Sequence, residues 1–216
     1  MNGKGTPMAA AGKAEYFQRE LSFEEKFFHP GPAGKSLEAG CGNGVFQQRL
    51  GLDSYGLDLD LGYLQANPCR HLVCAYMERM PFKDACFDHA YAITSLQYTD
   101  FGKAFAELLR VTRKGGRIGF TLPNAFSLAG LHRALLLLLN HYRFQGKPLP
   151  RPKMEATPWL TARVLGDARV KAVKASGSEV AFYPWGKGHW PWLEARLPCF
   201  LKVLFGREVF YLLEKR

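Results

Sequence analysis

Three closely spaced glycines follow an acidic residue in the segment 38–44, which reads Glu-Ala-Gly-Cys-Gly-Asn-Gly. The segment stands between an expected strand and an expected helix. Because glycine has no Cβ, the chain can turn tightly there and a ligand can approach the backbone. Asp58 ends the next expected strand, where a carboxylate can accept two hydrogen bonds from a ribose diol. Together these features predict a nucleoside site, although a plain tight turn would explain the glycines alone about as well.

The spacing of the glycines distinguishes two kinds of nucleoside ligand. A dinucleotide-binding turn has the pattern G-x-G-x-x-G and leaves a helix N-terminus free for the pyrophosphate. Here Gly40, Gly42 and Gly44 give G-x-G-x-G, and Glu38 precedes them. A carboxylate aimed into the site repels a pyrophosphate, whereas it attracts a ligand that carries an ammonium and a sulfonium. The pattern therefore favours S-adenosylmethionine over a nicotinamide dinucleotide.

The segments that would position these residues alternate between short apolar runs and helix-like stretches. Five runs are expected as strands: 36–39, 55–58, 71–75, 87–93 and 117–122. Helices are expected over 45–50 and 61–66, and an apolar stripe with helical spacing starts at Phe101. Asp100 can cap that helix and Gly115-Gly116 can end it. This alternation predicts an α/β fold, a doubly wound, mostly parallel Rossmann-like sheet with helices on both faces.

The alternation ends after Pro123. A helix is expected over 127–142, and a proline-rich loop follows over 146–152. Thr157 and Pro158 suit the N-cap and the first position of another helix. Later strand candidates are 169–174, 179–183 and 208–213.

Four short motifs stand in order along the first part of the chain. They are LEAGCGNG at 37–44, YGLD at 55–58, MPF at 80–82 followed by FD at 87–88, and ELLRV at 107–111 followed by GG at 115–116. In this order and spacing they resemble the motifs of the class I S-adenosylmethionine-dependent methyltransferases of the small type 11 kind. The resemblance covers residue 37 to about residue 122.

The resemblance implies a fold and a cofactor. The family sheet has seven strands with the last one antiparallel, and 208–213 would supply that strand. A lead and lid helix would occupy 1–34, and a single methyltransferase domain 35–216. Within that domain, 123–207 would contribute the substrate-side helices and loops. S-adenosyl-L-methionine is the implied cofactor, and no metal ion is expected.

The resemblance also implies roles for individual residues. Cofactor contacts are expected from Glu38, Gly40, Cys41, Gly42, Asp58, Leu59, Tyr76, Met77 and Thr94. Tyr98 and Gln97, which follow the fourth strand, are the candidate catalytic residues. Tyr16, Ser95 and His132 are expected on the substrate side. Asp88 is interpreted as a structural acid at the start of its strand.

The chain departs from the family pattern at three places. Tyr76 stands where many members have an Asp that binds the adenine amino group, although a phenol can also donate, accept or stack. Lys114 replaces a Pro before the double glycine. Around Gln97 and Tyr98 many members place a His, so no general base is inherited from the family.

Composition limits the class of protein. With 216 residues, 47% of them hydrophobic, the chain has material for one domain with a sizeable core, which excludes a disordered chain. Its longest apolar runs are far shorter than the roughly 20 residues of a membrane-spanning helix. Five Cys without C-x-x-C spacing argue against a disulfide framework or a zinc site, and they fit a reducing cytoplasm.

Charge and aromatic residues suggest the acceptor. Residues 1–100 carry 9 Lys and Arg against 12 Asp and Glu, whereas residues 101–216 carry 20 against 7. All four Trp lie after Pro123. Apolar surface beside basic charge suits a small, partly apolar or anionic methyl acceptor. RNA is an alternative acceptor, because basic charge with interleaved aromatics can bind single strands, but no Asn-Pro-Pro-Tyr-like motif follows the fourth strand.

Three further alternatives remain open. The chain could bind S-adenosylmethionine without catalysing transfer and act as a sensor or partner subunit. The apolar residues after Pro123 could form a helix that contacts a membrane surface, or they could form a core helix and a homodimer interface.

Overall fold

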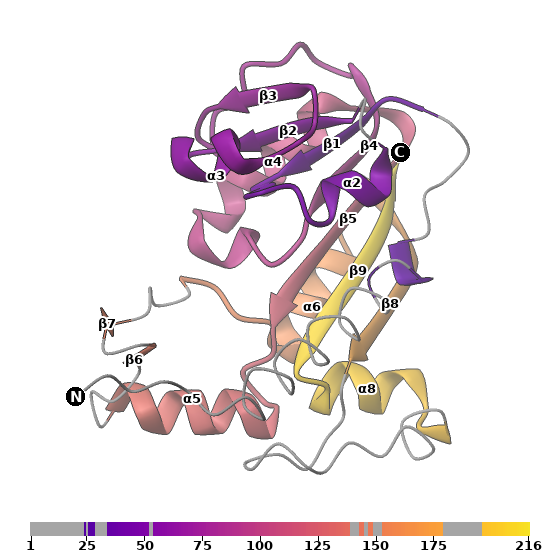
Figure 1. Ribbon diagram of the computed structural model, residues 1–216. Helices are drawn as coiled ribbons and strands as arrows, with labels where there is room; N and C mark the ends of the chain where they lie inside the picture. The colour runs from indigo at the N-terminus through magenta and orange to yellow at the C-terminus, as the bar shows by residue number, and fades with distance from the viewer. Residues whose placement is uncertain are drawn as a thin grey trace, which may run out of the picture.

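The computed structural model describes residues 24, 26–28, 34–51, 54–138, 143–144, 147–148, 153–178 and 196–216. A seven-stranded sheet in the order β3-β2-β1-β4-β5-β9-β8 runs through this part of the chain (Figure 1). Its strands are β1 (Ser36–Ala39), β2 (Tyr55–Asp58), β3 (His71–Cys74), β4 (Phe87–Ala92), β5 (Thr112–Pro123), β8 (Val170–Ser178) and β9 (Glu208–Lys215). Strands β1 to β5 pair in parallel, and β9 pairs antiparallel with both β5 and β8. The prediction of a mostly parallel sheet with an antiparallel last strand is confirmed.

Helices lie on both faces of the sheet and at one end of it. They are α2 (Gln47–Leu50), α3 (Leu61–Ala66), α4 (Phe101–Val111), α5 (Leu128–Leu138), α6 (Pro158–Leu165) and α8 (Cys199–Phe205), with a 3-10 turn, η1 (Leu96–Tyr98). Figure 1 shows α2 in front of the sheet, α4 and α6 behind it, and α5 and α8 at the lower end. A two-stranded hairpin, β6 (Arg143–Phe144) and β7 (Lys147–Pro148), follows α5.

Side-chain caps fix the starts of three helices. The Asp60 carboxylate accepts hydrogen bonds from two amides of the first turn of α3, and Asp100 accepts one from the Lys103 amide at 3.2 Å. The Thr157 hydroxyl accepts one from the Leu160 amide at 3.1 Å, and Pro158 opens α6. These bonds satisfy amides that have no partner within the helix. The predicted caps at Asp100 and Thr157 are confirmed.

The core has two parts, one on each face of the sheet. Alternate residues of a strand point to opposite faces. On β9, Tyr211 joins the large cluster with α4 and α6, whereas Phe210 joins an aromatic cluster with Phe27, Phe28 and Tyr91. Both faces of the sheet are therefore covered, as a parallel sheet requires.

One expected helix end is wrong. The helix that begins at Phe101 ends at Val111, and Gly115-Gly116 lie inside β5. The amide of Thr112 donates to the Leu108 carbonyl and its hydroxyl donates to the same oxygen at 2.7 Å, so the chain turns into the strand directly after the helix. The two glycines fall in an irregular part of the β4–β5 pairing.

Several other boundaries differ from the expected ones. The helix expected over 45–50 is shorter, because residues 45 and 46 form a turn. The strand expected over 169–174 extends through Ser178, and α8 was not expected at all. Of the expected helix 127–142, residues 128–138 are helical and 139–142 lie outside the described residues. The expected strand 179–183 also lies outside them.

Candidate cofactor site

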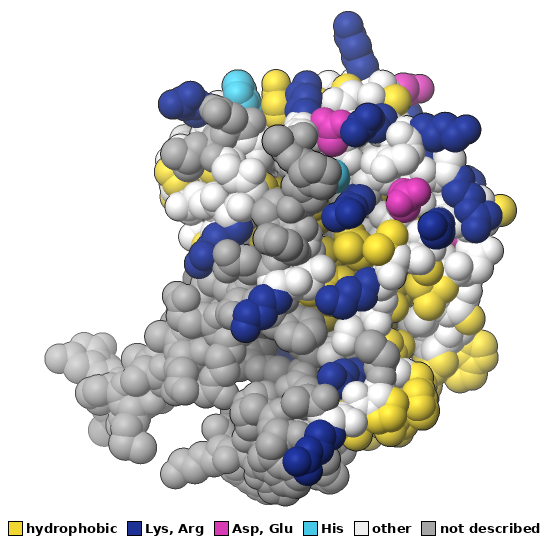
Figure 2. Space-filling model, turned by 90° about the vertical axis from the view of Figure 1, so that its right-hand side faces the viewer, with side chains coloured by type: hydrophobic (Ala, Val, Ile, Leu, Met, Phe, Trp, Pro, Cys, Tyr) yellow, Lys and Arg dark blue, Asp and Glu magenta, His cyan; other side chains and the backbone are white. Residues whose placement is uncertain are grey.

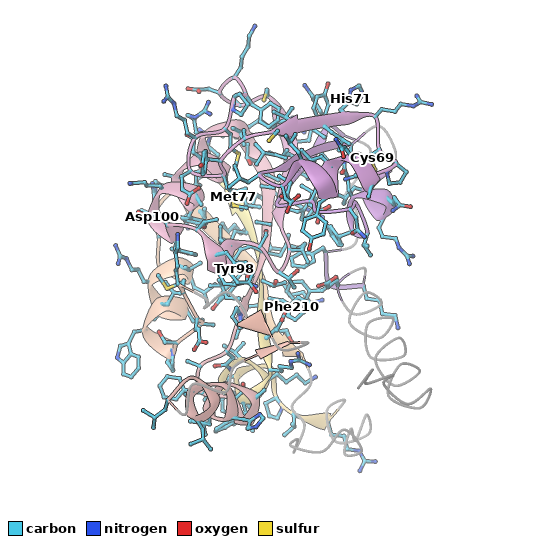
Figure 3. All side chains as sticks on the ribbon, turned by 60° about the vertical axis from the view of Figure 1, so that its left-hand side comes forward. Cys69, His71, Met77, Tyr98, Asp100 and Phe210 are labelled. Atoms are coloured by element: carbon cyan, nitrogen blue, oxygen red, sulfur yellow. The ribbon has the colours of Figure 1, made fainter. Side chains whose placement is uncertain are left out.

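The loops that follow β1, β2, β3 and β4 meet at the carboxyl edge of the sheet, on the left in Figure 1. In open parallel sheets, ligands bind in the crevice outside this edge. The Ser95 hydroxyl, in the loop after β4, donates to the Ala39 carbonyl at 2.8 Å and joins the β4 loop to β1. Figure 3 shows Met77 and Tyr98, from the loops after β3 and β4, on the same side of the molecule. Residues that are far apart in the sequence therefore lie together at the carboxyl edge of the sheet.

The glycine loop has a backbone that side chains would not tolerate. Gly40, Gly42 and Gly44 all have positive φ, at 77°, 51° and 82°. A Cβ on Gly40 would lie 2.3 Å from the Ser95 Cβ, so this position is packed against the β4 loop. Around Gly42, by contrast, no heavy atom lies within 4 Å of an added Cβ. The loop therefore packs inward at Gly40 and leaves open space at Gly42, where a ligand can approach the backbone.

Asp58 ties this loop to the turn after β2. One of its carboxylate oxygens accepts from the Gly42 amide at 2.8 Å, and the other accepts from the Asp60 amide at 2.9 Å. The side chain is half-buried. A carboxylate oxygen has two lone pairs, so each oxygen can still accept a second hydrogen bond. Asp58 can therefore hold the loop and a ligand diol together.

Glu38 is a buried carboxyl beside the loop. Its Oε2 is buried and makes no hydrogen bond with any residue that the structure describes. Burial raises the pKa of this carboxyl well above its ordinary value of 4.5, and the negative charges of Glu24 and Asp58 raise it further. A buried carboxylate needs a partner of opposite charge. The orphaned oxygen therefore fits a cationic ligand group such as the ammonium or sulfonium of S-adenosylmethionine.

Asn67 supports the glycine loop through hydrogen bonds, a role that the sequence analysis did not predict. Its amide nitrogen donates to the Gln47 side-chain oxygen at 2.8 Å and the Gly42 carbonyl at 3.3 Å, and its Oδ1 accepts from the Cys69 amide at 3.0 Å. A Cβ on Gly44 would lie 2.3 Å from that Oδ1. The dipeptide Asn67-Pro68, a common turn signal, was the available indication of a structural role.

Cys41 lies inside the loop and is buried. Burial raises the pKa of its thiol to about 12, and the nearby carboxyls of Glu38 and Asp58 act in the same direction. Since the thiolate is the nucleophilic form of cysteine, this raised pKa makes the Cys41 thiol a poor nucleophile at neutral pH.

Three residues expected around the adenine differ in exposure. Leu59 and Tyr76 are exposed at the carboxyl edge, whereas Met77 is buried. The Met77 methyl carbon lies 3.3 Å from the position that a Cβ on Gly40 would take. Met77 therefore supports the glycine loop, while Leu59 and Tyr76 present free surface.

Thr94, directly after β4, has a strained backbone. Its φ is +49°, which is rare for a β-branched residue. The Thr94 amide donates to the Thr121 hydroxyl at 2.8 Å, and the Thr94 carbonyl accepts from the Gln97 amide nitrogen at 2.8 Å. Such conformations persist where neighbouring groups enforce them, and they concentrate at functional sites.

The two candidate catalytic residues occupy different environments. Gln97 is buried, and its Oε1 has no hydrogen-bond partner among the described residues. Its backbone carbonyl accepts from the Lys153 amide at 2.7 Å, which attaches the segment before α6 to this edge. Tyr98 is 45% exposed. Gln97 thus organises the loop, and Tyr98 is open to a ligand.

The substrate-side residues are not all brought together. Ser95 lies in the crevice. His132 is exposed on α5, at the lower end of the molecule in Figure 1, away from the ends of β1 to β3. Tyr16 lies outside the described residues.

Two motifs brace the fold instead of lining the crevice. Asp88 accepts from the Lys35 amide at 2.6 Å and pairs with Arg113, as its interpretation as a structural acid requires. Arg110 donates to the carbonyls of Met80 at 2.9 Å and Phe82 at 2.7 Å. Glu107 pairs with Arg110 at 2.7 Å, and the hydrogen bonds from Arg110 hold the pKa of the Glu107 carboxyl below its ordinary value.

Neither a metal cluster nor a membrane-spanning helix is found in the part of the chain that the structure describes. Within it, no three His, Cys, Asp or Glu side chains are grouped to hold a metal ion. None of its helices combines the length and the hydrophobicity that crossing a bilayer requires.

Comparison of sequences finds a family model and curated relatives that match part of the chain. Residues 37–120 match the family model described as a methyltransferase domain. The chain is 37% identical over 106 residues to the malonyl-[acyl-carrier protein] O-methyltransferase of Pseudescherichia vulneris, and 36% identical over 108 residues to that of Erwinia billingiae. These matches cover 45% and 46% of this chain but only 42% and 43% of the relatives, so the chain spans less than half of their length.

Comparison of structures extends the likeness over the whole fold. The geranyl diphosphate C-methyltransferase of Streptomyces coelicolor, solved with Mg²⁺, geranyl diphosphate and S-adenosyl-L-homocysteine, matches with a TM-score of 0.62 at 15% identity. That match covers 100% of this chain and 88% of the other. An S-adenosylmethionine-dependent methyltransferase from Mesorhizobium loti matches with a TM-score of 0.59 at 15% identity, over 85% of this chain and 91% of the other.

Proposed function

We propose that this chain, which carries a methyltransferase domain on the class I fold, binds S-adenosylmethionine at the carboxyl edge and transfers its methyl group to an acceptor that is already anionic. The family model supports the domain, and the shared fold supports the place of the site. The observation that carries the cofactor assignment is the buried Oε2 of Glu38, which has no hydrogen-bond partner among the described residues, together with the open backbone at Gly42.

The residues of the crevice would hold the cofactor by complementary chemistry. Glu38 would face the cationic methionine end, because a buried carboxylate is stabilised by a nearby positive charge. Asp58 would accept the ribose hydroxyls with its remaining lone pairs. Leu59 and Tyr76 would offer exposed apolar and aromatic surface to the adenine.

Positioning is the main contribution that the protein makes to transfer. When bound, S-adenosylmethionine supplies a methyl group on a sulfonium, which is a good leaving group. Holding a nucleophile in line with that methyl group can supply about 7–11 kcal/mol of the barrier. Thr94 and Ser95 lie at the end of β4 and would shape the space for the nucleophile, and the hydrogen bonds from Gln97 and to Thr121 keep this backbone in place.

The side chains at this edge favour an acceptor that needs no base. In the segment between β4 and α4, Thr94, Ser95, Gln97 and Tyr98 provide hydroxyl and amide groups, and this segment contains no His or Lys. A general base is needed when a hydroxyl or a protonated amine must lose its proton. A carboxylate is already ionised at neutral pH. The basic charge of residues 101–216 attracts such an acceptor, and the curated relatives are named as O-methyltransferases.

The experiment follows the fate of the methyl group. Purified protein is incubated with S-adenosylmethionine carrying a labelled methyl group and with panels of carboxylic acids, phenols and amines. Label that is incorporated and then released as methanol by mild alkali identifies a carboxyl methyl ester. Label that resists alkali would contradict the carboxylate acceptor, and binding of cofactor without transfer to any panel would favour the catalytically silent alternative.

RNA is the second candidate acceptor, and the basic surface is the observation that favours it. Figure 2 shows Lys and Arg side chains over much of one face, with few Asp or Glu. Electrostatic binding of RNA weakens steeply with salt. Titration with a tRNA at low and at moderate salt tests this candidate, and no binding at low salt removes it.

A further inference from the structure

A cavity that is open to solvent lies away from the glycine loop, between α6, β8 and α8. Its volume is about 410 Å³. Its walls are Pro158, Ala162 and Leu165 on α6, Ala175 on β8, and Phe200, Val203 and Leu204 on α8, with Asn124, Ala156, Thr157 and Thr161 completing them. None of the residues that form the crevice contributes to these walls. The cavity is therefore a separate place for a ligand.

The polar groups in these walls are already satisfied. The Asn124 amide nitrogen donates to the carbonyls of Val203, Leu204 and Gly206, and its Oδ1 accepts from the Phe126 amide. The Thr161 hydroxyl is bonded to the Tyr211 hydroxyl at 2.7 Å, and the Thr157 hydroxyl accepts from Leu160. Since little hydrogen-bonding capacity remains for an occupant, the cavity suits an apolar group.

Large exposed hydrophobic side chains lie beside the cavity. Trp159 is 73% exposed and Phe200 63% exposed, and the Trp159 ring lies 5.9 Å from that of Phe126. Figure 2 shows hydrophobic side chains gathered at the lower right of one face, next to Lys and Arg. Exposed apolar patches with a polar border mark binding sites.

The charge and the volume of the cavity limit which class of molecule can occupy it. The described walls carry no charged side chain, because Arg163 and Lys202, the charged residues of α6 and α8, lie on other faces of their helices. A cavity of 150 Å³ can hold benzene, so about 410 Å³ accommodates on the order of a dozen carbon atoms. An unbranched aliphatic chain matches both the apolar walls and this volume.

We propose that the cavity between α6, β8 and α8 binds the acyl chain of a single-chain amphiphile of the fatty-acid class. This site is distinct from the cofactor crevice, and its occupancy does not depend on methyl transfer. The chain would lie among the walls of the cavity, and the carboxylate head would stay in solvent at the open side, where Pro158, Ala162 and Phe200 are exposed.

The test uses decanoate as the probe, measured by calorimetry on the full chain. Ala162→Phe and Ala175→Leu fill the cavity from two different walls, and Ala168→Phe is the matched control, because Ala168 is exposed and outside the walls. We expect saturable binding to the unmodified protein and a loss of affinity of about tenfold or more in both filled variants. The control should bind within about twofold of the unmodified protein, and butyrate should bind at least about tenfold more weakly than decanoate.

Three results would overturn the proposal: no saturable binding of decanoate, equal binding by the filled variants, or equal binding of butyrate. Thermal unfolding of each variant shows whether it is folded, independently of any ligand. S-adenosyl-L-homocysteine affinity is measured in parallel, so that failure at the cofactor crevice is distinguished from failure at this cavity.

Discussion

The cofactor crevice and the α6–α8 cavity differ in whether their buried polar groups are hydrogen-bonded within the protein. In the crevice, Glu38 and Gln97 keep buried oxygens without a hydrogen-bond partner among the described residues, and Thr94 keeps a strained backbone. In the cavity, Asn124 and Thr161 are hydrogen-bonded within the protein. Unsatisfied polar groups are costly unless a ligand satisfies them. This difference is what we expect if the crevice binds a polar, charged ligand and the cavity binds an apolar one.

Gly40→Ala should break the crevice most severely. The new Cβ would strike Ser95 and force a non-glycine residue into positive φ, so we expect cofactor affinity to fall about 100-fold or more and stability to fall by roughly 2–5 kcal/mol. Gly115→Ala is the control, since Gly115 has φ +74° but open space around it. It should cost roughly 1–2 kcal/mol and leave affinity unchanged. Equal effects of both variants on cofactor affinity in calorimetry would refute the close packing at Gly40.

Glu38→Gln should have opposite effects on ligand binding and on stability. Losing the carboxylate removes the partner for a cation, so affinity should fall about tenfold or more. Without ligand, the folded carboxyl holds its proton to higher pH than the unfolded one, because burial raises its pKa. As pH rises from 4.5 to the pKa of the folded state, ionisation of this carboxyl therefore lowers the free energy of unfolding. The substitution removes this pH-dependent loss of stability. Chemical unfolding of both proteins across pH should show the variant gaining relative stability toward neutral pH.

The same carboxyl predicts that cofactor binding releases a proton. A cation beside Glu38 lowers the pKa that burial had raised. Calorimetry about one pH unit above 4.5, in two buffers of different ionisation enthalpy, should therefore give different apparent binding enthalpies for the unmodified protein and a smaller difference for Glu38→Gln. Identical differences in both proteins would contradict a cationic ligand group at Glu38.

Asp58→Ala should weaken cofactor binding by about tenfold or more, through loss of charge-assisted hydrogen bonds to the ribose and of the bond that holds Gly42. Asp60→Asn is the matched control, because asparagine also caps a helix while the neighbouring charge is removed. We expect this control to stay within about twofold. If both variants lose affinity equally, the general negative charge of the turn, and not Asp58, binds the cofactor.

Tyr98→Phe should have the smallest effect. With an anionic acceptor no proton has to be removed, so kcat/KM should change by no more than about threefold. A loss of about 100-fold or more, together with a changed pH profile, would show that the phenol acts as a general base or acid.

The sequence predicted the cofactor half well because its signals are local. The strands over 36–39 and 55–58, the cap at Asp100 and the loop glycines all follow from short patterns that the chain must satisfy wherever it folds. The dipeptide Asn67-Pro68 indicates a turn, but no local pattern predicts that the Asn67 amide nitrogen supports the glycine loop, because the groups to which it donates lie 20 to 26 residues away.

The other half was harder to predict because tertiary packing decides it. The helix α8 is fixed by contact with β8, where a Cβ on Gly177 would lie 1.7 Å from the Lys202 carbonyl oxygen. The helix α4 ends before Thr112, whose hydroxyl bonds back to the Leu108 carbonyl, although the double glycine that begins three residues later is the stronger sequence signal. The cavity itself joins residues from 124 to 204, and no spacing rule connects them.

The brace made by Glu107 and Arg110 limits what a family signature can reveal. These side chains bind the backbone of residues 80 and 82, so two of the four motifs, ELLRV and MPF, form one structural contact. Selection for folding alone would preserve this contact in a related protein that had lost its catalytic activity. A family model built from such positions therefore groups proteins by common ancestry. Positions such as Glu38 and Thr94 are the ones that should distinguish active enzymes from inactive members.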